Sequence, residues 1–99
     1  MESKISAKSI SSPAVRKRSD IDIMANILDK AKKGTKKTRI MYRCNLSHKQ
    51  LQVYLDLLLE MEFLEFHEKK EGDKQNYFRT TSKGLEFLDA YRTLKSLMA

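Results

Sequence analysis

Apolar residues recur every three or four positions near the start of the chain, which is the spacing of one face of an α-helix. The positions concerned are Ile23, Met24, Ile27, Leu28 and Ala31. Ser19 and Asp22 precede them with the spacing of a capping box, and Gly34 is a typical residue just after a helix end. The pattern therefore predicts a helix over residues 20–33.

Two further helices are predicted after this one. A short helix of two turns is expected over 37–43, followed by a tight turn at 44–46, where Asn45 tolerates the left-handed backbone conformation. Ser47 and Gln50 form a second capping box at the start of a third helix. The apolar face expected for that helix consists of Leu51, Tyr54, Leu55, Leu58 and Leu59.

The pattern then changes from the helical period to that of a hairpin. Residues 63–68 and 77–80 are rich in aromatic residues and predict two strands, joined by a polar loop over 69–76 that contains a Gly–Asp pair. Thr81 caps a last helix that continues to about Met98. The order helix, helix, turn, helix, hairpin, helix predicts an α+β fold, mostly α: a winged helix-turn-helix with an added C-terminal helix.

The chain length and the distribution of charge set the domain organisation. Ninety-nine residues correspond to one domain. We expect a disordered basic arm over 1–18, which has five basic residues against one acidic residue and no apolar period, then a winged domain over 19–81 and the C-terminal helix over 82–99. The net charge of +7 points to a polyanionic partner, although basic surface also serves solubility.

Several function classes find no support in the sequence. Catalysis needs a nucleophile with its base, a carboxylate pair or metal ligands, and no such spacing is present, so we expect no enzyme activity, cofactor, metal or small-molecule ligand. Cys44 is the only cysteine and is expected to be a small apolar filler. Without an apolar span or a secretory signal, the expected location is the cytoplasm, associated with the nucleoid.

The third helix carries the candidate base-reading residues. A helix-turn-helix leads into the major groove with the N-terminal residues of its second helix. A glutamine can read adenine through two hydrogen bonds, and lysine or histidine can reach guanine acceptors or phosphate. The alternative is an ordinary solvated polar face. The candidates are Ser47, His48, Lys49 and Gln52.

A second set of candidates suits the DNA backbone, where contacts need only charge in the right place. Lys36, Lys37, Arg39 and Arg43 belong to the second helix and its approach. Lys69, Lys70 and Lys74 surround the hairpin loop, with Arg79 at its base, although acidic residues in the loop partly cancel their charge. The alternative interpretation of either set is an ordinary run of charged residues on the protein surface.

Two blocks of sequence resemble a known family. They are the run Lys37–Arg43 with Asn45–Ser47, Leu51 and Tyr54–Leu55, and the run Thr81–Gly84 leading into Leu85 and Leu88. These blocks are similar to the archaeal winged helix-turn-helix proteins, both the ten-kilodalton chromatin-associated proteins and the DNA-binding domains of archaellum-type regulators. The resemblance implies double-stranded DNA as partner, a homodimer built through the last helix and an archaeal or archaeal-virus source. It leaves open whether the role is regulatory or architectural.

The last helix has an apolar seam suited to dimerisation. Its seam residues Phe87, Ala90, Leu94 and Leu97 are spaced as in a coiled coil, and Tyr91 widens the stripe. The same stripe can instead pack on the first helix of its own chain. The alternative function is a protein-interaction winged helix of the transcription machinery, and its binding would survive high salt, whereas DNA binding would not.

Overall fold

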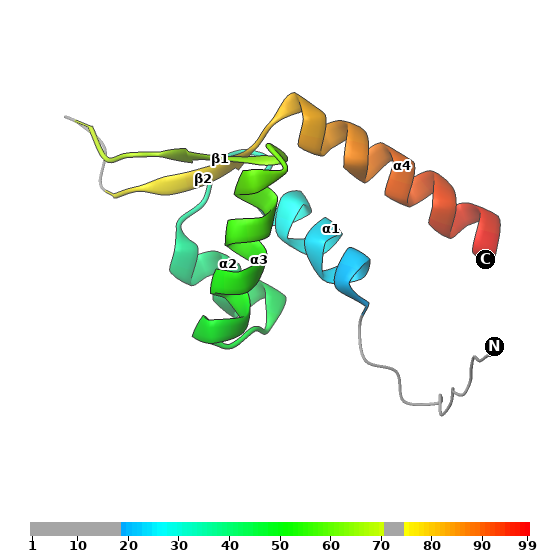
Figure 1. Cartoon of the computed structure of the whole chain (residues 1–99), viewed down its shortest axis with the longest axis horizontal. Helices are drawn as coiled ribbons and strands as arrows, with labels where there is room; N and C mark the ends of the chain where they lie inside the picture. Colours follow the sequence, from blue (N-terminus) through cyan, green and yellow to red (C-terminus); the bar gives the residue numbers. More distant parts are fainter. Residues whose placement is uncertain (1–18, 71–74) are drawn as a thin grey trace.

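The computed structural model describes residues 19–70 and 75–99, and in these parts the elements follow the predicted order. Figure 1 shows a two-stranded hairpin projecting from a group of helices. The mostly helical α+β class is therefore confirmed. The predicted arm over 1–18 and the loop tip at 71–74, including Lys74, lie outside the described residues. The elements are α1 (Asp20–Lys30), α2 (Lys37–Cys44), α3 (His48–Glu60), β1 (Leu64–His67), β2 (Tyr77–Thr80) and α4 (Ser82–Met98).

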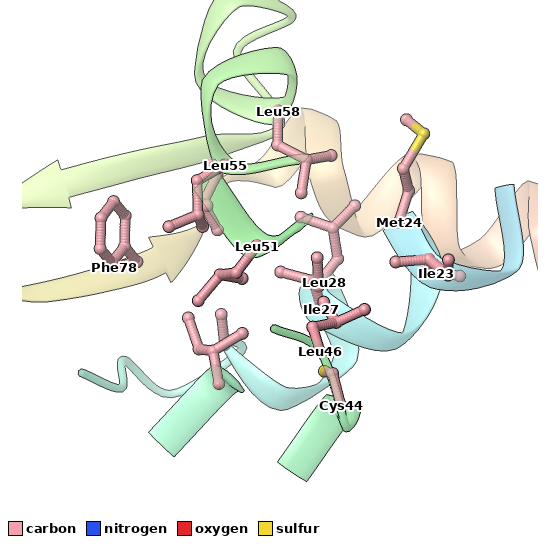
Figure 2. Packing of buried hydrophobic residues seen from close by; sticks show 14 of the residues in the cluster. Ile23, Met24, Ile27, Leu28, Cys44, Leu46, Leu51, Leu55, Leu58 and Phe78 are labelled. Atoms are coloured by element: carbon pink, nitrogen blue, oxygen red, sulfur yellow. The ribbon is translucent and has the colours of Figure 1, made fainter. Parts of the chain in front are cut away.

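The core forms where α1, α2 and α3 meet the inner face of the hairpin (Figure 2). The three leucines Leu51, Leu55 and Leu58 of α3 are buried at helical spacing and pack in one cluster with Ile27 and Leu28 of α1. Burying such side chains is the dominant favourable contribution to folding. Cys44 at the end of α2 is fully buried in the same cluster, as expected of a small apolar filler.

The predicted helix starts are confirmed, but α1 is shorter than expected. Ser19 and Ser47 both take part in complete capping boxes at the starts of α1 and α3. The prediction that the first helix reaches residue 33 is wrong, because strand β2 takes up the carbonyl groups at the end of α1. The Thr80 backbone N–H donates to Ala31 O (3.0 Å), and its hydroxyl donates to Leu28 O (2.6 Å).

The hairpin is a regular antiparallel pair tied to the segment before α2. Leu64 lies opposite Thr80 and His67 lies opposite Tyr77. Thr35 adds an isolated bridge to Phe78, with backbone hydrogen bonds of 2.9 and 2.8 Å in the two directions. The chain entering α2 is therefore fixed to the base of the hairpin, which we call the wing.

The first half of α4 buries apolar side chains against the domain, whereas the apolar side chains of its second half are largely exposed. Leu88 is buried, and the Phe87 ring lies 5.0 Å from the Phe63 ring. Beyond Tyr91, Leu94 and Leu97 are 46% and 78% exposed, and α4 extends past α1 (Figure 1). The apolar stripe thus has an intramolecular part and a part without cover in the described chain.

The contact between α1 and α4 gives a testable pH dependence. Tyr91 Oη donates to Asp22 Oδ1 (2.5 Å), and this bond, followed by that from Ser19, lowers the pKa of Asp22 from 3.8 to about 2. A lowered carboxyl pKa stabilises the folded state above the unfolded value, and the effect is lost as the pH falls from about 4 through 2. Tyr91→Phe should therefore cost about 1 kcal/mol at pH 7 and reduce the loss of stability on acidification.

Urea unfolding at pH 7 and at acid pH measures this difference. Tyr42→Phe is the matched control, because Tyr42 is 86% exposed on α2 and its ring adds nothing to the core. Equal acid sensitivity of the wild type and Tyr91→Phe would show that this hydrogen bond does not set the pKa of Asp22.

Candidate nucleic-acid interface

The start of α3 presents a histidine and a lysine side chain to solvent. The Ser47 hydroxyl oxygen accepts from the Gln50 backbone N–H (3.1 Å), so its capping role is fixed, and its hydrogen and one lone pair remain for another contact. His48 and Lys49 are exposed in the first turn. The three residues occupy the positions from which a recognition helix reaches base edges.

Gln52 is held by a chain of hydrogen bonds that the sequence did not reveal. Its Oε1 accepts from Lys37 Nζ of α2 (2.5 Å), and its Nε2 donates to Asp56 Oδ1 (2.9 Å). A glutamine amide has two donor hydrogens and two acceptor lone pairs, so one of each remains for an outside partner. These hydrogen bonds orient the Gln52 amide and hold Lys37 against α3, so Lys37 is not available as an independent contact to the DNA backbone.

The cationic side chains of α2 and its N-cap differ in exposure. Arg39 and Arg43 are exposed and Lys36 is half-buried at the N-cap. Lys36 makes no side-chain capping bond, and the first turn has no acidic residue, in contrast to α1. The surface of this helix is therefore positive and suited to an anionic partner.

The approach to α2 and the base of the wing line an open, shallow hollow of about 590 Å³. It exists because the Thr35–Phe78 bridge holds the two segments together and Gly34, at φ +89°, turns the chain under the Tyr77 ring. The lining residues are Lys33, Gly34, Thr35, Lys36, Arg39, Gln75, Tyr77 and Arg79. Lys36 and Arg39, predicted with the second helix, and Arg79, predicted in the wing, therefore line one site.

The remaining wing candidates lie further out. Lys69 and Lys70 are exposed beyond the end of β1, and the Lys69 backbone N–H donates to Asn76 Oδ1 (2.5 Å). They do not line the hollow. Lys74 belongs to the part of the loop outside the described residues.

Sequence reasoning missed three residues of this surface. Lys33 was assigned to a helix that ends earlier, and Tyr77 was assigned only to a strand. Val53 is 60% exposed on α3, one turn after Lys49. The i, i+4 spacing from Lys49 was the available signal for Val53, because it places both side chains on one helix face.

The described residues show neither a metal site nor a membrane span. No cluster of three or more His, Cys, Asp or Glu side chains in residues 19–70 and 75–99 is arranged to hold a metal ion. The same parts of the chain contain no helix long and apolar enough to cross a membrane.

Comparison with known proteins agrees with this geometry. A family model described as winged helix-turn-helix matches residues 17–99. Sso10a-2, a DNA-binding protein from Sulfolobus solfataricus, is similar in structure, with a TM-score of 0.72 and 21% identity over 82% of each chain. A search of curated proteins found no significant match.

Two bacterial structures share the fold at lower identity. A variant of MepR from S. aureus bound to an oligodeoxyribonucleotide has a TM-score of 0.65 and 10% identity, over 80% of this chain and 57% of that one. A variant of ZitR from Lactococcus lactis has a TM-score of 0.60 and 15% identity, over 87% and 57%. This chain thus spans somewhat more than half the length of the bacterial proteins, and the predicted winged fold is confirmed.

Proposed function

We propose, from the premise that this chain belongs to the winged helix-turn-helix family, that it binds double-stranded DNA without catalysing a reaction. The predicted resemblance is confirmed by that match and by the archaeal structural neighbour. In the proposed complex, α3 enters the major groove, α2 and the wing contact the backbone, and two chains bind together as a homodimer. The role is that of a transcriptional regulator or of an architectural protein.

One observation carries this proposal. The exposed start of α3, the exposed face of α2 and the base of the wing all present cationic side chains. A helix start for the major groove and flanking charges for phosphates are the two parts that a DNA reader needs. Lys32, just after α1, and Arg92 and Lys95 on α4 differ, because these three side chains pair with aspartates of α1.

Removing the charges of α2 is the first test of the proposal. A variant with Lys36, Arg39 and Arg43 replaced by alanine should bind random and selected duplexes more weakly alike, and Lys37 is left in place because it orients Gln52. The slope of log K against log salt should fall by about 0.9 for each phosphate that the variant no longer neutralises. Fluorescence anisotropy across a salt series measures both quantities, and the ratio between selected and random duplexes separates a regulator from an architectural protein.

The control for this test removes the same formal charge elsewhere. Lys32, Arg92 and Lys95 all lie within ion-pair distance of aspartates on α1, so their replacement by alanine should leave the salt slope unchanged. Equal slopes for both variants and the wild type would remove α2 from the interface. Wild-type binding that is insensitive to salt would instead favour a protein-interaction module.

The start of α3 is tested by a double substitution. Lys49→Ala with Gln52→Ala should lower affinity for a selected duplex by about 1–3 kcal/mol, as expected for removal of one bidentate base interaction, with a smaller effect on random DNA. Glu60→Ala, on an exposed position at the far end of the same helix, is the control. An equal loss on both kinds of DNA would show that these side chains bind backbone and read no base.

A further inference from the structure

The hollow between α2 and the wing gathers charge from three separate segments. Lys33 follows α1, Lys36 and Arg39 belong to the start of α2, and Arg79 comes from β2. The lining in the described part of the chain includes these four cationic side chains and no carboxylate. Like charges brought together in this way repel one another, so the site is most stable when an anion occupies it.

The acidic side chain directly opposite Arg79 forms no ion pair with it. Glu65 lies opposite Arg79 in the hairpin, but its carboxylate is 3.0 Å from the His67 ring nitrogen. Arg79 instead lies over the Tyr77 ring, 5.9 Å from its centre. Within residues 19–70 and 75–99, no ion pair joins any of the four cations to a carboxylate.

The walls of the hollow are fixed to one another by backbone contacts. The two Thr35–Phe78 hydrogen bonds connect the α2 side to the wing side. At Gly34, a Cβ atom would lie 3.0 Å from Tyr77 Cδ2, so the backbone passes as close to the ring as glycine allows. Lys36 from the α2 side and Arg79 from the wing side thus line one site whose backbone is fixed.

We propose that this hollow binds a single phosphodiester of the DNA backbone, held jointly by α2 and the wing. The proposal rests on the proposed function and deepens it, because it joins two predicted contacts into one and adds Lys33 and Tyr77. Guanidinium and ammonium groups converging on one phosphate form charge-assisted hydrogen bonds, which are stronger than bonds between neutral groups. In this proposal a single phosphate fixes the positions of both the wing and α2 along the duplex.

The test combines protein variants with neutral linkages in the DNA. A selected duplex is prepared as a series in which one phosphate at a time, within one half-site, is replaced by an uncharged methylphosphonate. Lys36→Ala and Arg79→Ala are each measured against the whole series by anisotropy. On natural DNA each variant should lose about tenfold in affinity, as expected for a hydrogen bond to a charged group.

The expected result is that both substitutions cease to change the affinity when the same linkage is made neutral. Once that phosphate is neutral, wild type, Lys36→Ala and Arg79→Ala should bind with nearly equal affinity. Lys33→Ala should couple to the same linkage. Lys69→Ala is the control on the wing outside the hollow, and its effect should persist when that linkage is neutral. Circular dichroism confirms that each variant is folded.

Two results would overturn the inference while leaving the proposed function intact. One is that Lys36→Ala and Arg79→Ala couple to different linkages, which would mean separate phosphates. The other is that Arg79→Ala binds natural DNA as the wild type does. A wild-type protein that shows no salt-sensitive binding to any duplex would contradict the proposed function itself.

Discussion

Replacing Gly84 with alanine should destabilise the domain severely. Gly84 is buried in the first turn of α4, where an added Cβ would lie 2.2 Å from Phe63 O and 2.7 Å from Thr80 Cγ2. Phe63 O cannot turn aside, because it is backbone and accepts from the Thr81 N–H (3.0 Å). The start of α4 would have to move away from the hairpin.

The expected loss in the free energy of unfolding is about 4 kcal/mol or more, the upper end for point substitutions. Such a loss is a large share of the roughly 5–15 kcal/mol that stabilises a typical domain. Urea unfolding measures it. Glu86→Ala, at an exposed position of the same helix, should change stability by no more than about 0.5 kcal/mol. A Gly84→Ala protein with the midpoint of the wild type would mean that α4 does not approach Phe63 this closely.

Features controlled by neighbouring residues were predictable from the sequence. The capping boxes at Ser19 and Ser47 depend on a side chain and a backbone N–H three residues apart, so the local pattern was sufficient. Asn45 adopts the left-handed conformation (φ 56°) expected for the turn. Strand β2 at Tyr77–Thr80 also has the predicted bounds, because its aromatic residues follow directly after a polar loop.

Features set by contacts between distant segments were not predictable in this way. The end of α1 depends on Thr80, and the hollow depends on the pairing of Thr35 with Phe78. The engagement of Gln52 by Lys37 requires α2 and α3 to be placed first. The close contact at Gly84 is made by Phe63, and the whole hairpin lies between these two residues in the chain. No periodicity in a single segment contains this information.

The apolar stripe on α4 lies between these two cases. Its period correctly indicated an apolar face but did not show which part the chain itself would cover. The structure divides the stripe at Tyr91: Leu88 before it is buried, whereas Leu97 and Met98 after it are 78% and 70% exposed. A hollow of about 380 Å³ between the start of α1 and the end of α4 adjoins the uncovered part, and Leu94 lines it. This geometry supports the proposed homodimer.

Replacing Leu94 and Leu97 with glutamate should give a folded monomer that binds DNA much more weakly. The stability of the domain should change little, because both side chains lie beyond the buried part of α4. A dimer places two recognition helices on one duplex, so binding of the second helix becomes intramolecular, and its absence should lower affinity about 100-fold or more. Sedimentation gives the oligomeric state, and anisotropy gives the affinity.

The matched control is Thr93→Glu with Ser96→Glu, which adds the same charge to exposed polar positions of the same helix turn. If added negative charge alone weakened DNA binding, both double variants would lose affinity equally. If the apolar end of α4 joins two chains, only the leucine variant becomes monomeric and loses affinity. A wild-type protein that sediments as a monomer at tens of micromolar, with or without DNA, would contradict the dimer. A leucine variant that unfolds would instead place the whole stripe in the core of its own domain.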